Sequence, residues 1–180
     1  MRSVAEEILV EKKFKELFAT LPDVTWTNPV TASVESFTPI FEIGDERDFN
    51  QFIKEENVFR PIIWLDSEFE ENFMTDGIEV DVNLILPILN DDSAMFNEER
   101  LDLSFVNILR PLLENVLKAI NRGNTMFVTE DSVKVTKFYN YGTRTETDKG
   151  KQVISVPVDA YRLSIGVKIN NYCLRTINYG

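Results

Sequence analysis

Apolar residues recur at helical spacing in two parts of the chain. Near the start they share one face of a helix that Pro22 ends, and they are Val10, Phe14, Leu17, Phe18 and Leu21. A second apolar face lies within residues 102–122 and consists of Phe105, Leu109, Leu112, Leu113, Val116, Leu117 and Ile120. Gly123 follows it as a C-terminal stop, so a long helix is predicted there.

Pro111 lies inside this second predicted helix. An interior proline removes one backbone hydrogen bond and clashes with the preceding turn. The residue therefore either kinks a single helix or occupies the first position of a shorter helix that starts near Arg110. A kinked or two-part helix is expected.

Two apolar segments between these helices predict strands of a central sheet. Residues 61–65 (Pro-Ile-Ile-Trp-Leu) are typical of a buried strand, and residues 80–86 alternate as a half-buried strand does. The residues between them include many acids and no Lys or Arg. We therefore expect an acidic connection that projects into solvent.

Strands dominate the sequence after Gly123. They are predicted over Met126–Val128, Val133–Tyr141, Val153–Val158 and Tyr161–Ile169. The last of these alternates strictly with a period of two, which indicates a sheet with one buried face. Pro157 predicts a broken or offset strand pair, and the Thr-rich, charged residues 142–150 predict the long loop of a β-hairpin.

The segment that follows the first helix has a less regular pattern. Prolines interrupt short β-prone pieces at residues 24–27 and 38–43, which favours irregular edge strands or an extended arm. Asp45 is placed to cap a short helix that runs to about Glu56.

These elements together predict one α+β domain over residues 1–180, with residues 24–57 as an irregular insertion or arm within it. Its sheet is expected to be mixed and mainly antiparallel. An N-terminal helix and one long central helix pack on the sheet, and a β-hairpin extends from it. The length of 180 residues and the 43% hydrophobic composition are typical of a chain that buries a substantial core.

The formal net charge of −11 limits the partners of this chain. Affinity for nucleic acid comes mainly from clustered Lys and Arg, so DNA is expected only as passing cargo without specific binding. No apolar run approaches the length of about 20 residues that crosses a bilayer. The first 21 residues are amphipathic and charged, unlike a secretory signal peptide. We therefore expect a soluble protein that is not exported by the Sec pathway.

Several catalytic and metal sites are incompatible with the composition. The chain has no histidine, which excludes Ser-His-Asp and Cys-His catalysis, and Cys173 is its single cysteine. Neither of the common glycine-rich phosphate-binding motifs is present. The acidic stretch that begins at Asp66 has Glu71 where a calcium loop needs glycine, and Gly77 where it needs a bidentate acid. We predict no catalytic residue, no metal and no cofactor.

Two segments are candidates for binding. The first is an acidic surface of Asp66, Glu68, Glu70, Glu71, Asp76, Glu79 and Asp81. The second is the hairpin, with Tyr139 and Tyr141 on its stem and Arg144, Glu146 and Asp148 near its tip. Aromatic anchors and charge pairs could bind a neighbouring subunit. Alternatively, the tyrosines cover the sheet of their own domain.

The order of elements resembles the neck and tail-completion proteins of tailed bacteriophages, including tail-terminator-like subunits. The resemblance covers most of residues 3–169. It is carried by the early helix through Leu21, Ile62–Leu65, Asp81–Leu86, Phe105–Ile120 and the hairpin ending in residues 159–165 (Asp-Ala-Tyr-Arg-Leu-Ser-Ile). Residues 24–57 depart from the pattern because this segment is longer than expected before the first core strand.

The resemblance implies a structural subunit of the virion and not an enzyme. Such proteins form rings of identical subunits, commonly sixfold or twelvefold, that join the portal-bearing head to the tail around the DNA channel. The expected partners are further copies of the chain and other neck, portal or tail proteins, with assembly in the bacterial cytoplasm. The acids would face the channel or a neighbouring ring, and residues 139–148 would reach the adjacent subunit.

Two other functional classes stay open at this point. One is a non-enzymatic accessory protein of bacterial origin that binds a peptide or another protein through an exposed sheet edge. The other is an enzyme built on two carboxylates held about 5–10 Å apart, as in glycosidases.

Overall fold

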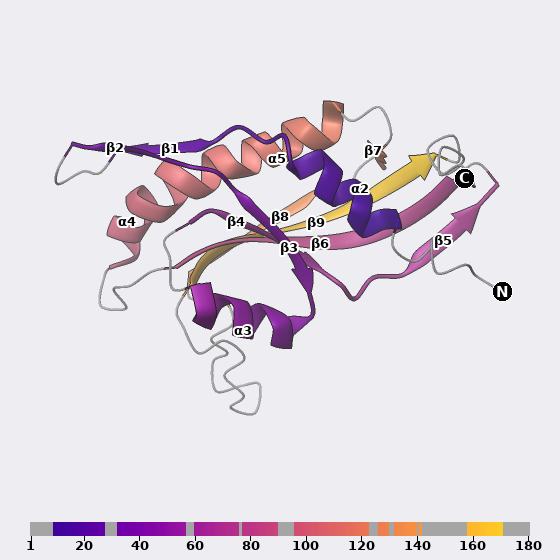
Figure 1. Cartoon of the computed structure of the whole chain (residues 1–180), viewed down its shortest axis with the longest axis horizontal. Coiled ribbons are helices and arrows are strands. Elements are labelled where there is room, and N and C mark those ends of the chain that lie inside the picture. The colour runs from indigo at the N-terminus through magenta and orange to yellow at the C-terminus, as the bar shows by residue number, and fades with distance from the viewer. Residues whose placement is uncertain are drawn as a thin grey trace.

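The computed structural model of the chain describes residues 9–27, 32–56, 60–75, 77–89, 96–122, 126–129, 132–139, 141 and 158–170. Helices pack on a mixed, mainly antiparallel sheet of seven strands, so the predicted α+β class is confirmed (Figure 1). Within these ranges, none of the helices combines the length and apolar character needed to span a membrane.

Two long strands form the centre of the sheet. β6 (Gly77–Leu89) and β9 (Val158–Asn170) pair antiparallel along their whole lengths. Both contain the period-two alternation seen in the sequence, and both extend beyond the predicted strands. The segment before Tyr161 is continuous with β9, so the separate strand predicted to end at Val158 is wrong at that boundary. Residues 153–157 lie outside the described part of the chain.

Shorter strands complete the sheet on both sides of this pair. β4 (Ile62–Asp66) and β5 (Glu71–Met74) share the outer edge of β6. β3 (Ile40–Gly44) runs parallel to β4 beyond it. On the other side β7 (Met126–Val128) and β8 (Lys134–Phe138) share the edge of β9. The β8–β9 pairing confirms the stem of the predicted hairpin.

β5 corrects the expectation of a purely exposed loop between β4 and β6. It forms a hairpin with β6, with Glu71 opposite Val80 and Met74 opposite Gly77. Its sequence, Glu-Asn-Phe-Met, has little β-strand character of its own. The pairing arises because the long strand β6 offers an unoccupied edge beyond the residues that contact β4.

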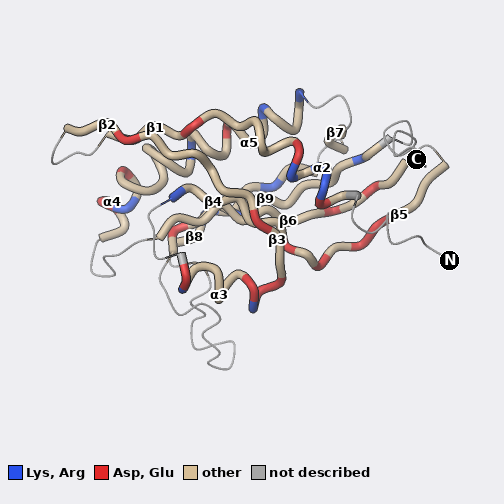
Figure 2. Tube along the Cα trace, in the orientation of Figure 1, with Lys and Arg blue, Asp and Glu red and all other residues tan. Residues whose placement is uncertain are grey.

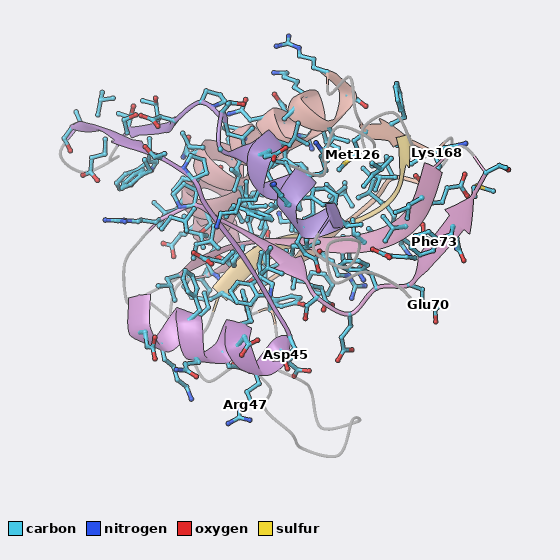
Figure 3. The ribbon with its side chains drawn as sticks, turned by 45° about the vertical axis from the view of Figure 1, so that its right-hand side comes forward. Asp45, Arg47, Glu70, Phe73, Met126 and Lys168 are labelled. Atoms are coloured by element: carbon cyan, nitrogen blue, oxygen red, sulfur yellow. The ribbon has the colours of Figure 1, made fainter. Side chains whose placement is uncertain are left out.

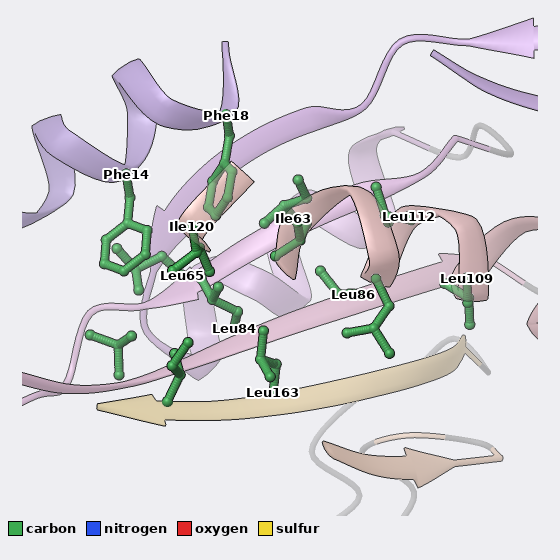
Figure 4. Close-up of a cluster of buried hydrophobic side chains, with 14 of the residues drawn as sticks. Phe14, Phe18, Ile63, Leu65, Leu84, Leu86, Leu109, Leu112, Ile120 and Leu163 are labelled. Carbon is green, nitrogen blue, oxygen red and sulfur yellow. The ribbon is translucent and has the colours of Figure 1, made fainter. Parts of the chain in front are cut away.

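One face of the sheet carries the main helical layer. α2 (Leu9–Phe18) and the continuous helical segment α4 (Asn97–Arg100), η1 (Leu101–Leu109) and α5 (Arg110–Arg122) lie over it. Figure 4 shows the core between these layers, where side chains from both helices and from β4, β6 and β9 meet. The apolar helical faces predicted for residues 10–21 and 105–120 are confirmed, since Phe14, Phe105 and Leu112 are fully buried.

The helical segment changes geometry just before Pro111. η1 is a π-helix, and the N–H of Arg110 donates to the carbonyl of Phe105, five residues back. α5 then begins at Arg110, so the two-part alternative is confirmed. Pro111 has no N–H to donate. The π-helical turn is wider than an α-helical turn, which relieves the clash between the proline ring and the carbonyl groups of the preceding turn. The segment also begins at Asn97, earlier than predicted.

On the opposite face of the sheet, the helix that the structure describes is α3 (Glu46–Glu56), which covers one end. Asp45 caps this helix as predicted, because its Oδ1 accepts from the N–H groups of Arg47 at 2.8 Å and Asp48 at 2.9 Å. Phe49 and Ile53 pack in a second, smaller core with side chains of β4, β6 and β9.

Two strands stand apart from the main sheet. β1 (Val24–Thr27) and β2 (Val34–Phe37) form an antiparallel pair that projects along the helical layer in Figure 1. Val24 and Trp26 are buried, whereas β2 is largely exposed. The edge strands predicted at residues 24–27 and 38–43 thus correspond to β1 and β3.

Candidate functional site

The β4–β5 connection brings part of the predicted acidic surface together. Glu68 and Glu70 are exposed on it, and Asp81 projects from β6 beside them. With Phe69 and Asn72 these three acids line a hollow of about 520 Å³, and the lining contains no basic side chain. Phe69 is half-buried against the main core, which anchors the connection.

The other predicted acids lie elsewhere. Asp66 is half-buried at the end of β4, where its Oδ1 accepts from the N–H of Glu68 at 3.2 Å and holds the turn. Glu71 lies on β5, and Glu79 stands opposite Lys168 of β9, where a charge pair is favourable. Asp76 lies outside the described residues.

The start of α3 extends the acidic surface, and sequence reasoning missed this. Asp45, Glu46 and Glu68 line a second hollow of about 430 Å³ together with Arg47, Asn50 and Lys54. Figure 3 shows Asp45 and Arg47 at this end of α3 and Glu70 farther along towards β5. These segments meet because β3 and β4 pair in parallel, with Gly44 opposite Asp66. No local sequence pattern predicts the pairing of β3 with β4.

The acids are spread along the surface and do not converge on a point. Within the described ranges, no group of three or more Asp, Glu, His or Cys side chains is placed to hold a metal ion. Repulsion between spread carboxylates is reduced by solvent, which is how an acidic surface persists without a counter-ion. The arrangement suits contact with a basic surface better than coordination.

A polar ladder crosses the sheet face opposite the main helical layer, next to the acidic hollow. Ser164 donates to Asn83 at 2.7 Å, and Asp81 stands opposite Gly166. A Cβ on Gly166 would lie 2.4 Å from Thr129 Oγ1 and 2.8 Å from Asp81 Oδ1. The chain after β7 therefore crosses this face so closely that only glycine fits.

The two hairpin tyrosines contact their own domain. The Tyr139 ring lies 4.9 Å from that of Phe105, on the helix-covered face. The Tyr141 ring lies 6.2 Å from that of Phe49 and 5.3 Å from that of Phe138, on the α3 side. These contacts are those expected of tyrosines that cover the sheet. Arg144, Glu146 and Asp148 lie outside the described residues.

The fold alters the acidity of Tyr141. Burial raises the pKa of its phenol above the ordinary value near 10. Arg162 opposes this rise, while Asp66 and Glu46 add to it. The phenol is therefore neutral over the physiological range, as suits a packing residue.

A buried ion pair fixes the start of the helical segment to the sheet. Arg100 and Asp159 are 2% and 0% exposed, and Arg100 Nε donates to Asp159 Oδ2 at 3.2 Å, with a second bond from Nη2 to Oδ1. The guanidinium also lies 5.4 Å from the centroid of the Tyr139 ring. Sequence reasoning missed this pair, because its members are 59 residues apart.

A groove of opposite charge lies between the C-terminal ends of α2 and α5. Its volume is about 320 Å³, and its lining consists of Leu17, Thr20, Leu21, Pro22, Asn115, Lys118, Ala119 and Arg122. Among the described residues that line it, Lys118 and Arg122 are the charged ones. The sequence signal was their exposed position on an amphipathic helix, which ordinarily indicates only a solvated face.

Comparisons with known proteins do not assign this chain to a family. No protein-family model matches the sequence, and no curated protein is significantly similar to it. The functional argument therefore rests on the fold and on the surfaces described above.

Proposed function

We propose that this chain is a non-enzymatic structural subunit of a homo-oligomeric ring in the neck or tail of a tailed-bacteriophage virion. The ring would join the portal-bearing head to the tail around the DNA channel. The order of elements, which resembles that of phage neck proteins, supports the neck or tail of a virion as the location. The surface of the fold supports a subunit that binds other proteins.

The observation that carries the proposal is a set of β-hairpins that present exposed apolar side chains. Val34 on β2 is 67% exposed, Phe73 and Met74 on β5 are 48% and 47% exposed, and Val135 on β8 is 40% exposed. Exposed apolar side chains on separate elements are available to pack against other proteins. A ring subunit needs such contacts on two sides at least, because each copy has two neighbours.

The test is the assembly state of the purified full-length protein. Sedimentation velocity over a range of concentrations, followed by electron microscopy, should show closed rings with a central opening. A monomer that persists at high concentration would contradict the proposal and favour the accessory-protein alternative, in which a single copy binds a peptide through a sheet edge.

Within such a ring the acidic surface faces either the channel or a neighbouring copy. A surface that only repels DNA needs carboxylates and water. The face of β5 that carries Asn72 of the acidic hollow also carries the exposed Met74, which a channel wall does not require.

A further inference from the structure

We infer that the acidic end of one copy docks into the α2–α5 groove of the next copy. The acidic end is defined as Glu68, Glu70, Asn72 and Met74, and the α2–α5 groove as Leu17, Leu21, Pro22, Lys118, Ala119 and Arg122. This inference rests on the proposed ring and names the two surfaces that would close it.

The groove offers an apolar floor with a basic rim. Leu17 and Leu21 are half-buried and pack partly on the main core, so their outer sides face the groove. Lys118 and Arg122 stand on exposed positions of α5 at its C-terminal end. A ligand for this groove should therefore combine apolar side chains with carboxylates.

The acidic end has that combination. Glu68 and Glu70 are exposed, and Asn72 lines the acidic hollow with them. Met74 shares the face of Asn72 on β5 and is 47% exposed. In Figure 3 Glu70 lies on the β5 side of the molecule. Large exposed apolar side chains next to acids are unfavourable in water and become favourable against a basic, apolar partner.

The charges around the two surfaces are of opposite sign. Figure 2 shows blue segments at the C-terminal end of α5 and red segments along β5 and β6, whereas α2 and α3 carry both colours. α5 contains Arg110, Lys118 and Arg122 against one acid, Glu114. A second copy is thus the partner whose charge complements both surfaces without any further component.

The two surfaces belong to different parts of the molecule. The groove lies between α2 and α5 in the helical layer, whereas the acidic end lies at the β5–β6 hairpin. A contact between unlike surfaces on identical subunits is head-to-tail, and it generates a ring when the rotation closes. The inferred contact therefore has the symmetry that a ring requires.

The experiment exchanges charge between the two surfaces. One variant carries Glu68→Lys with Glu70→Lys, and a second carries Lys118→Glu with Arg122→Glu. Each variant alone presents like charges at the contact, so self-association should weaken on the order of 100-fold. An equimolar mixture should assemble again, because each surface of one variant complements a surface of the other. Sedimentation velocity and electron microscopy measure all three samples.

Matched controls change the same charge elsewhere. Lys12→Glu with Lys15→Glu reverses exposed cations on the side of α2 away from the groove, and Glu35→Lys with Glu42→Lys reverses exposed acids on β2 and β3. Both controls should assemble as the wild type does. Thermal unfolding of every variant verifies that the fold is retained.

The outcomes separate this inference from the proposed function. Rings that form equally well from both charge-reversed variants would overturn the docking contact and leave the ring intact. Variants that dissociate but do not reassemble on mixing would show that the two surfaces do not pair. A wild-type protein that stays monomeric would overturn both the contact and the ring.

Discussion

The two faces of the central sheet come from the same strands and differ in what covers them. On β6, the side chains of Val80, Val82 and Leu84 are buried beneath the helical layer. Glu79 and Asp81 alternate with them and face the other way, where the structure describes only α3 as a helical cover, at one end. One face therefore stabilises the fold, and the other presents polar groups to solvent or to a partner.

The difference between the two faces allows one sheet to stabilise the domain and also to present a polar surface for binding. The covered face buries nearly all of its apolar side chains, and burial contributes roughly 25 cal/mol per Å². The polar face contributes less, since its residues exchange water for cross-strand bonds such as Ser164 to Asn83. Substitutions on the two faces should thus have unequal effects.

The largest expected difference is between two phenylalanines. Phe105→Ala on the covered face should lower the free energy of unfolding by about 3–5 kcal/mol, because the ring is 1% exposed and leaves a cavity. Phe127→Ala on the polar face should cost less than about 1 kcal/mol, since that ring is 47% exposed. Urea unfolding of both variants measures the contrast, and equal losses would show that the faces are not distinct in the way described.

Substitutions in the buried Arg100–Asp159 ion pair measure how much this charged contact stabilises the fold beneath the helical layer. Arg100→Leu should cost about 3 kcal/mol, because it leaves the buried Asp159 carboxylate without its partner. The double variant Arg100→Leu with Asp159→Leu should recover much of this loss. A double variant as unstable as the single one would indicate that packing, and not charge, holds this end of the helical segment.

Gly166→Ala probes the polar face where the chain crosses it closely. Glycine to alanine normally favours a strand by about 0.5–1 kcal/mol. Here the added methyl would meet Thr129 Oγ1 and Asp81 Oδ1, so we expect a loss of about 1–3 kcal/mol instead. Ser164→Ala, two residues away on the same face, serves as the comparison and should lose about 1 kcal/mol with its hydrogen bond. A stabilised Gly166→Ala would refute the close approach.

The smallest effect concerns Tyr141, at the end of the polar face that α3 covers. Its pKa is raised in the folded protein, so its contribution to stability is complete below the unfolded value of about 10 and is lost as pH rises through the folded pKa. Tyr141→Phe should remove this component, and the variant should lose less stability than the wild type between about pH 9 and pH 11. Identical alkaline profiles would show that the phenol is not buried as described.

Much of the fold was predictable because its signals are local. The helical spacing from Val10 to Leu21 and the alternation from Tyr161 to Ile169 each specify an element and its buried face. Pro111 indicated a divided helix, although the π-helical form of the preceding turn depends on packing against the sheet. β5 was missed because its pairing comes from the free edge of β6 and not from its own residues.

The candidate surfaces were predictable only in part. The run from Asp66 to Asp81 showed that acids would gather, and three of them do share a hollow. Their extension to Asp45 and Glu46 depends on the parallel pairing of β3 with β4. The α2–α5 groove depends on two helices that are about 100 residues apart in the chain meeting at their C-terminal ends.

The sequence by itself determined the class of fold, the buried face of each long element and the excess of negative charge. These properties follow from residue spacing and composition, which act over a few neighbouring residues. Only the tertiary structure decided which acids lie together, that Arg100 meets Asp159, and that a basic groove and an acidic end occupy different parts of the molecule. Those outcomes depend on strand order and helix packing, through which residues distant in the chain become neighbours.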